Sequence, residues 1–158
     1  MKIVIVYAGK SGTTEKAAGI LKRKLKGAEL VDLSVEDPDV SGADLVVIGS
    51  NVRFGRLHKK VRGFVAKNRD VLLGKRTAYF VCCGFPEKQE EYFKESIPKE
   101  LLDRAVIRDS FGGELNAEKQ KGFDKLIIKM VNKATGGKQE VKLLSDKIDD
   151  FAEVLKKQ

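Results

Sequence analysis

The sequence predicts an α/β domain in which a five-stranded parallel sheet carries helices on both faces. Short apolar runs rich in β-branched residues recur along the chain without polar alternation, as expected for strands buried on both faces. Amphipathic helical patterns separate these runs, and strands that alternate with helices form parallel sheets through right-handed crossovers. The 158 residues suit one hydrophobic core, so we expect a single domain, 1–158.

The expected elements follow one another with short turns between them. The first strand is 2–7, and the helix after it carries apolar residues at helical spacing before Gly27 ends it: Ala17, Ala18, Leu21 and Leu25. The other expected strands are 29–33, 45–49, 77–83 and one that begins at 105 and ends near 112. The other expected helices are 56–69, 88–96, 118–135 and 146–157. Ser145 is the candidate N-cap of the last helix.

Positive charge is concentrated in the first half of the chain. The sequence has 31 basic and 23 acidic residues, a net charge of +8, and residues 1–79 hold 16 of the basic and 8 of the acidic ones. Segment 53–76 alone has nine basic residues and one acidic residue. Such an excess suits nucleic acid, anionic lipid or an acidic ligand. We expect no nucleic-acid partner, because no recognition motif accompanies the charge.

The composition excludes several other classes of protein. The two cysteines, Cys82 and Cys83, are adjacent, and there is one histidine, so no disulfide framework and no metal site are expected. Small apolar packing is preferred over redox chemistry for both thiols. No apolar run approaches the roughly 20 residues of a membrane span, and no secretory signal opens the chain. A cytoplasmic location is therefore expected.

The turn after the first strand, residues 9–14, is the most informative stretch. Glycines and the hydroxyls of Ser11, Thr13 and Thr14 stand at the start of a helix, where backbone N–H groups favour an anion. A P-loop would need a glycine where Val4 stands, and a dinucleotide motif would need glycines at 11 and 14. The turn is therefore either a phosphate site of another kind or a capped turn without a ligand.

The turns after the first, third and fourth strands are all polar or rich in glycine. In a parallel sheet these turns lie at one edge, where ligands bind at the topological switch point. We expect the three loops to form one site.

Particular motifs in these loops resemble the flavodoxin-like family. Ser11, Gly12 and Thr14 match the phosphate loop of flavodoxins, Ser/Thr-x-Thr-Gly-x-Thr. Residues 50–58, Ser-Asn-Val-Arg-Phe-Gly-Arg-Leu-His, resemble an Arg-aromatic-Gly-x-x-His loop of menaquinone-dependent protoporphyrinogen oxidases. Residues 123–130 resemble the extra helix of those enzymes, so the similarity covers nearly the whole chain. Ala8, Gly9 and Ser11 stand where that family usually has two hydroxyl residues and an aspartate.

The resemblance implies a flavodoxin-like three-layer sandwich with strand order 2-1-3-4-5 and FMN as the cofactor. It also implies an FMN-dependent oxidoreductase that passes electrons from a porphyrinogen to menaquinone. The implied cofactor-binding residues are Lys10, Ser11, Gly12, Thr13, Thr14, Asn51, Val52, Arg53, Phe54, Gly55, Cys83, Gly84 and Phe85. The candidate catalytic residues are Arg53 and His58.

Four of these residues have alternative interpretations. The first is Arg53. Its guanidinium, about 6 Å from the flavin ring at an effective dielectric of about 20, would stabilise a reduced anionic flavin by about 3 kcal/mol, on the order of 100 mV for one electron. Arg53 would thus favour taking electrons from a substrate, or it is an ordinary surface arginine. His58 is suited to proton transfer, or it is exposed or caps a helix. Phe54 and Phe85 contact the flavin or fill the core.

Two functions remain open at this point. In the first, the chain is an enzyme whose basic segment orients the carboxylates of an anionic small-molecule substrate. In the second, it is a flavodoxin-type electron carrier that docks onto an acidic redox partner and has no substrate of its own. The lysines of helix 118–135 either lie on anionic lipid or face water from a packed helix. The resemblance to a quinone-linked family would fit peripheral contact with the inner face of a membrane.

Overall fold

The computed structural model of this protein describes residues 1–113 and 143–157. Five parallel strands form the central sheet in the order β2-β1-β3-β5-β6. Their bounds are β1 Ile3–Ala8, β2 Glu29–Asp32, β3 Leu45–Arg53, β5 Arg76–Cys82 and β6 Ile107–Ser110. A short strand, β4 (Arg56–Leu57), pairs antiparallel with the end of β3. The predicted order of the parallel strands, 2-1-3-4-5, is therefore confirmed.

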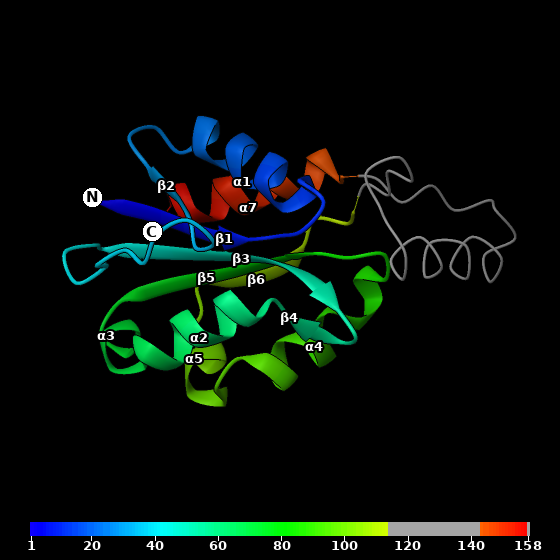
Figure 1. Ribbon diagram of the computed structural model, residues 1–158. Coiled ribbons are helices and arrows are strands. Elements are labelled where there is room, and N and C mark those ends of the chain that lie inside the picture. Colours follow the sequence, from blue (N-terminus) through cyan, green and yellow to red (C-terminus); the bar gives the residue numbers. More distant parts are fainter. Residues whose placement is uncertain (114–142, 158) are drawn as a thin grey trace, which may run out of the picture.

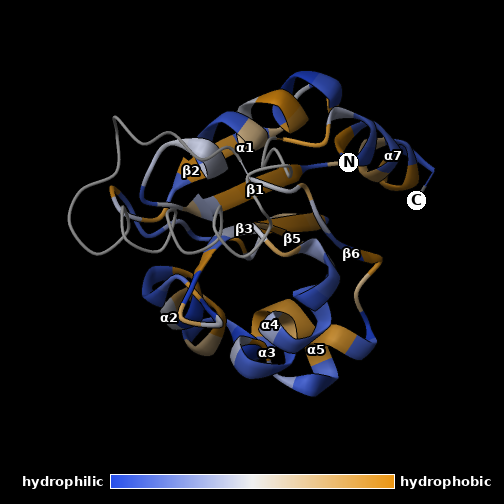
Figure 2. Cartoon of the chain, turned by 90° about the vertical axis from the view of Figure 1, so that its right-hand side faces the viewer, coloured by the Kyte–Doolittle hydropathy of each residue, from blue (hydrophilic) through white to orange (hydrophobic). Residues whose placement is uncertain are grey.

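Helices cover both faces of the sheet (Figure 1). One face carries α1 (Thr13–Lys24) and α7 (Ser145–Lys156). The other carries α2 (Lys59–Lys67), α3 (Arg69–Leu73), the 3₁₀ turn η1 (Pro86–Lys88), α4 (Gln89–Ser96) and α5 (Lys99–Asp103). The helices carry both apolar and polar residues (Figure 2), and their buried apolar residues pack with those of the sheet. This arrangement is the predicted three-layer sandwich.

The strands lack polar alternation because both of their faces are buried. Every residue of β1 is buried. Ile3 and Ile5 pack with the residues of α1 and α7, whereas Val4 and Val6 pack with those of α2 to α5. Strand β1 therefore contributes alternate side chains to two separate cores, and an apolar residue is needed at each of its positions.

A glycine in β3 makes room for an aromatic cluster that joins the sheet to α7. A Cβ atom at Gly49 would lie 2.1 Å from Cζ of Phe80 on the neighbouring strand. The Phe80 ring stacks on Phe111 with centroids 4.6 Å apart and meets Phe151 of α7 edge-on at 6.1 Å. The missing side chain at position 49 thus allows a large ring to lie over β3.

The structure differs from the sequence expectations at several element ends. The helix expected at 56–69 begins at Lys59, because residues 56–57 turn back onto β3, and α3 follows it as a separate short helix. Helix α5 was not expected. Ser145 is not the N-cap of α7: the cap position is Leu144 and no side chain caps it. The helix expected at 118–135 lies outside the described residues.

Candidate functional site

Three loops meet at the carboxyl edge of the sheet. They follow β1 (residues 9–12), β3 (the hairpin turn 54–55) and β5 (residues 83–85). These strands are adjacent and parallel, so their ends lie side by side on the right of Figure 1. The edge coincides with the switch point, where β1 separates β2 from β3.

The turn after β1 brings its backbone close to the first turn of α1. Gly12 has a φ of 89°, a left-handed conformation that glycine adopts without a steric cost, and it is the N-cap of α1. A Cβ at Gly9 would lie only 2.8 Å from the Cβ of Thr14. Both glycines are therefore required for the shape of this turn. Lys10 is exposed on its outer side.

The hydroxyls of this turn fit an anionic group. Ser11 Oγ and Thr13 Oγ1 lie 3.4 Å apart, and both residues are half-buried. Thr14 is 1% exposed, and among the described residues its Oγ1 has no hydrogen-bond partner other than the sulfur of the neighbouring Cys82, which is a weak acceptor. Buried hydroxyls normally have a partner. An unpartnered hydroxyl at a helix N-terminus is suited to a phosphate.

The β3–β4 hairpin presents an aromatic ring to solvent. Arg53 pairs with Arg56, and the two residues between them, Phe54 and Gly55, have φ angles of 55° and 74°. Two positive φ angles define a type I′ turn, in which a phenylalanine is unusual. The Phe54 side chain is 68% exposed, and the Arg53 guanidinium lies 5.4 Å from the centre of its ring. Phe54 is therefore not a core residue.

Serine side chains hold the base of this hairpin. Ser50 Oγ donates to the Asn51 carbonyl (2.7 Å) and accepts from the His58 backbone N–H (2.8 Å). The Leu57 N–H donates to Ser96 Oγ of α4 (2.9 Å). Neither serine is among the residues that the sequence predicts for the site. Ser50 ends a buried run and opens the motif 50–58, whereas nothing local connects Ser96 to the hairpin.

Two more residues predicted for the site lie at the end of β3. Asn51 and Val52 are half-buried. The Asn51 side-chain carbonyl oxygen is buried and accepts no hydrogen bond from residues 1–113 or 143–157. This edge of the sheet thus presents two buried polar atoms, Thr14 Oγ1 and Asn51 Oδ1, to which the described part of the chain offers only one weak partner, the Cys82 sulfur.

His58 is the N-cap of α2. Its Nδ1 atom accepts the Lys60 backbone N–H at 3.0 Å, which confirms the capping interpretation. Burial lowers the pKa of His58, and the nearby cations Lys59, Lys60 and Arg62 lower it further, whereas Asp32 opposes them. The neutral ring that accepts at Nδ1 carries its proton on Nε2. A catalytic role for His58 stays a prediction.

The loop after β5 begins with buried thiols. Burial raises the pKa of Cys82 to about 12 and also raises the pKa of Cys83. Both thiols are therefore protonated at neutral pH, which agrees with a packing role and leaves neither as a nucleophile. Gly84 and Phe85 are half-buried, and the Lys88 ammonium lies 5.6 Å from the centre of the Phe85 ring.

The basic segment 53–76 is divided between two ends of the molecule. Arg56, Lys59 and Lys60 are exposed beside the hairpin, and within residues 1–113 and 143–157 no carboxylate pairs with them. Helices α2 and α3 then run back across the sheet. Lys67 pairs with Asp37 and Arg69 with Glu100.

Further along, Lys75 donates to the carbonyls of Ser41 and Ala43 at 2.6 Å each, near the amino ends of the strands. A basic segment that orients carboxylates at the site would need all of its charge there, and this is wrong for the second half of 53–76. The chain turns back over the sheet, so charges that are close in sequence lie at opposite edges.

In the part of the chain that the structure describes, no helix is both long and apolar enough to span a membrane.

Comparison with known proteins agrees with this arrangement. The chain is 26% identical to protoporphyrinogen IX dehydrogenase [quinone] of Escherichia coli K12, over 90% of this chain and 84% of that protein. The fold is similar to oxidised Flavodoxin 2 from Bacillus cereus, with a TM-score of 0.63, 22% identity and 99% of both chains covered. It is also similar to a flavoprotein from Lactobacillus acidophilus solved in complex with FMN, with a TM-score of 0.57, 16% identity, and 69% of this chain and 92% of that chain covered.

A match to the flavodoxin domain extends over residues 4–142 and includes all three loops of the candidate site. The chain belongs to the flavodoxin-domain family.

Proposed function

We propose that this chain binds FMN at the carboxyl edge of its sheet and oxidises an anionic reduced substrate, with a quinone as the electron acceptor. The observation that carries the proposal is the turn after β1, where two glycines shape a cradle and the described residues give the buried Thr14 hydroxyl no partner but the Cys82 sulfur. The similarity to the E. coli dehydrogenase supports protoporphyrinogen IX as the substrate. The similarity to a flavoprotein solved with FMN supports the cofactor.

The residues present fit FMN in two parts. The hydroxyls and amides of residues 10–14 would hold the phosphate, because the start of α1 offers N–H groups and a positive helix end. Residues 51–55 and 83–85 would surround the ring. FMN would supply the redox chemistry, taking electrons from the substrate and passing them to the acceptor.

The chain's own residues would bind and orient the substrate and tune the site. Arg53 lies at the end of β3 with its guanidinium over the Phe54 ring. A cation there would favour negative charge on the flavin ring and hence electron transfer from the substrate to the flavin. Arg56, Lys59 and Lys60 would attract carboxylates, since they are exposed at the same edge. His58 would be a group able to exchange a proton, through Nε2.

A quinone acceptor would bring this edge to a membrane surface. Quinones with long tails partition into lipid, and exposed cations beside an exposed aromatic ring favour an anionic membrane surface. Peripheral contact through the hairpin is therefore part of the proposal.

The first experiment is the titration of apo-protein with FMN, followed by visible absorbance and flavin fluorescence. We expect a bound-flavin spectrum and quenched or shifted fluorescence. The FMN-loaded protein is then tested under anaerobic conditions for oxidation of protoporphyrinogen IX with a soluble menaquinone analogue. Turnover, and its loss in Arg53→Glu, would support the enzyme. FMN binding without turnover, together with a very low midpoint potential, would instead identify an electron carrier. Absence of FMN binding would overturn both functions.

A further inference from the structure

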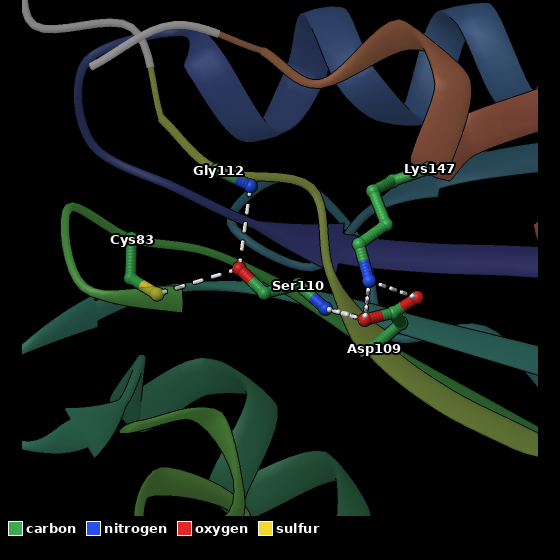
Figure 3. A network of polar contacts seen from close by, with 5 residues as sticks. All are labelled: Cys83, Asp109, Ser110, Gly112 and Lys147. Atoms are coloured by element: carbon green, nitrogen blue, oxygen red, sulfur yellow. Dashed lines mark hydrogen bonds and ion pairs between the residues drawn. The ribbon is translucent and has the colours of Figure 1, made fainter. Parts of the chain in front are cut away.

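The loop after β5 is attached to the turn that follows β6 (Figure 3). The Cys83 backbone N–H donates to the Gly112 carbonyl at 2.9 Å, and the Cys83 thiol lies 3.5 Å from Ser110 Oγ. Both contacts reach the residue directly before Gly84 and Phe85. The path of this loop therefore depends on groups supplied by β6.

Ser110 is the centre of that attachment. It is fully buried at the end of β6, and its Oγ accepts the Gly112 N–H at 3.2 Å. Gly112 has a φ of 72°, so the chain turns sharply here. The same oxygen contacts the Cys83 thiol, and either group can donate the proton of that contact. One hydroxyl thus joins the turn after β6 to the loop after β5.

The Cys83 sulfur extends the connection to Phe85. Burial raises the pKa of the Cys83 thiol, whereas hydrogen bonds from the Ser110 hydroxyl and the Phe85 backbone partly oppose this effect. The sulfur therefore lies between Ser110 and the backbone of the aromatic residue expected at the flavin. The sulfur thus has protein groups on these two sides, and Cys83 as a whole is 8% exposed.

Asp109 and the α7 residue Lys147 hold the end of β6 on the side away from Cys83. The Ser110 N–H donates to Asp109 Oδ1 at 2.8 Å. The Lys147 ammonium of α7 lies 3.2 and 3.3 Å from the two oxygens of Asp109. Figure 3 shows this ion pair on the side of β6 opposite Cys83. Strand β6 thus connects α7 at one side with the candidate site at the other.

We propose that Ser110 is a positioning residue for the flavin ring. It acts through Cys83 and Gly112 to hold residues 83–85 in the conformation that receives the ring, and it does not contact the phosphate. This inference rests on the proposed FMN binding. It assigns a role in the site to a strand that none of the predicted site residues occupies.

The test compares FMN with riboflavin, which has the same ring and no phosphate. In Ser110→Ala, the dissociation constants of both ligands should rise by the same factor, about tenfold, as expected for losing a buried hydrogen bond. The flavin midpoint potential should shift in the same variant. Cys83→Ala should act alike, whereas Cys83→Ser keeps a polar partner for Ser110 and should retain most of the affinity. The double variant should be less impaired than two independent effects predict, because both changes remove one contact.

Lys147→Gln is the matched control, because it removes the ion pair on the far side of the same strand. It should lower the melting temperature and leave riboflavin affinity unchanged. Unchanged riboflavin affinity and potential in Ser110→Ala, or additive effects in the double variant, would overturn the positioning role while FMN binding stands. If Ser110→Ala does not fold, equal affinities of Cys83→Ala and Cys83→Ser would overturn it. A wild-type protein that binds neither ligand overturns the proposed function as well.

Discussion

The buried Thr14 hydroxyl, which has only the Cys82 sulfur as a partner among the described residues, lowers the stability of the folded chain at its candidate site. A buried polar group without a hydrogen bond destabilises a protein by about 1–3 kcal/mol. Thr14 is buried between the turn after β1 and the end of β5, where the Cys82 thiol offers little compensation. A residue that lowers the stability of the folded protein is expected at a site where evolution has selected for ligand binding.

Replacing this hydroxyl should therefore separate stability from binding. Thr14→Val keeps the side-chain shape and removes the polar atom, so the melting temperature of the apo-protein should stay the same or rise by a few degrees. Its FMN dissociation constant should rise by at least about tenfold, whereas riboflavin affinity should not change. Thermal unfolding and fluorescence titration with both ligands measure this. A variant that loses stability and keeps FMN affinity would contradict the phosphate role.

At the scale of elements, the β3–β4 hairpin combines a strained tip with a tightly held base. Phe54 adopts a left-handed conformation at the tip, while Ser50 and Ser96 fix the strand ends. Backbone strain persists only where the surrounding structure enforces it, and it is concentrated at functional sites. Helix α2 follows directly and begins at the His58 cap, so hairpin and helix form one continuous unit.

The tip should be more stable with a residue suited to its φ angle. Phe54→Asn should raise the free energy of unfolding by up to about 1 kcal/mol, because Asn tolerates the left-handed region at the cost of a weak cation–π contact. Flavin affinity should fall in the same variant. Gly55→Ala is the control, and it should lower stability because a Cβ is unfavourable at a φ of 74°. Urea denaturation measures both effects, and a less stable Phe54→Asn protein would argue against strain.

The cap of α2 should make stability depend on pH. The pKa of His58 is lowered in the folded protein, so the unfolded chain binds its proton more readily. His58 therefore contributes stability above about pH 6.5, and this contribution is lost as the pH falls through the lowered value. His58→Asn keeps a capping side chain that does not titrate. Its stability should fall less than that of wild type between pH 7.5 and 5 in denaturant titrations.

His58→Ala removes the capping side chain altogether, in contrast to His58→Asn. Loss of the cap should cost about 1 kcal/mol at neutral pH, where the wild-type ring accepts the Lys60 N–H. A parallel pH dependence in wild type and His58→Asn would show that His58 does not carry the effect.

At the scale of the whole molecule, positive charge is distributed over both edges of the sheet. Arg56, Lys59 and Lys60 lie near the candidate site, whereas Lys22, Arg23 and Lys26 lie at the far end of α1. Each set has one arginine and two lysines, and all six residues are exposed. The two sets differ in location and not in charge.

Neutralising each set to glutamine tests whether location matters. The set beside the hairpin should raise the KM for an anionic substrate by about tenfold at low salt, and the effect should diminish as salt is added. The α1 set should change KM by less than about twofold, although it lowers the net charge equally. Equal effects of the two sets would mean that overall charge, rather than the hairpin, attracts the substrate.

The sequence predicted most of the fold because each strand carries its own signal. The apolar run at 3–7 must be buried on both faces, whatever its partners are. By contrast, β4 has only two residues, too few for any pattern, and Phe54 stands where a type I′ turn usually has Asn. Segment 53–76 is not one basic patch in the structure, because α2 and α3 carry its second half away from the hairpin. The number of charges in a stretch of sequence does not predict this direction.

The candidate site was predictable where its residues are consecutive. The turn at 9–14 is a local motif, and the order of the sheet places it beside the later loops. The contacts of Ser50, Ser96 and Ser110 join residues far apart in sequence, and no local pattern marks them. Groups that shape a loop from a neighbouring element become visible only in three dimensions.

The missing side chain at Gly49 gives positions 49 and 80 a shared volume. The Phe80 ring occupies the space that a Cβ at position 49 would need, so neither position can change size alone. In a library randomised at both positions, folded members should pair a larger residue at 49 with a smaller one at 80. A screen for folded protein that returned alanine at 49 together with phenylalanine at 80 would contradict this coupling. Positions 49 and 80, on neighbouring strands, would therefore be expected to change together in evolution.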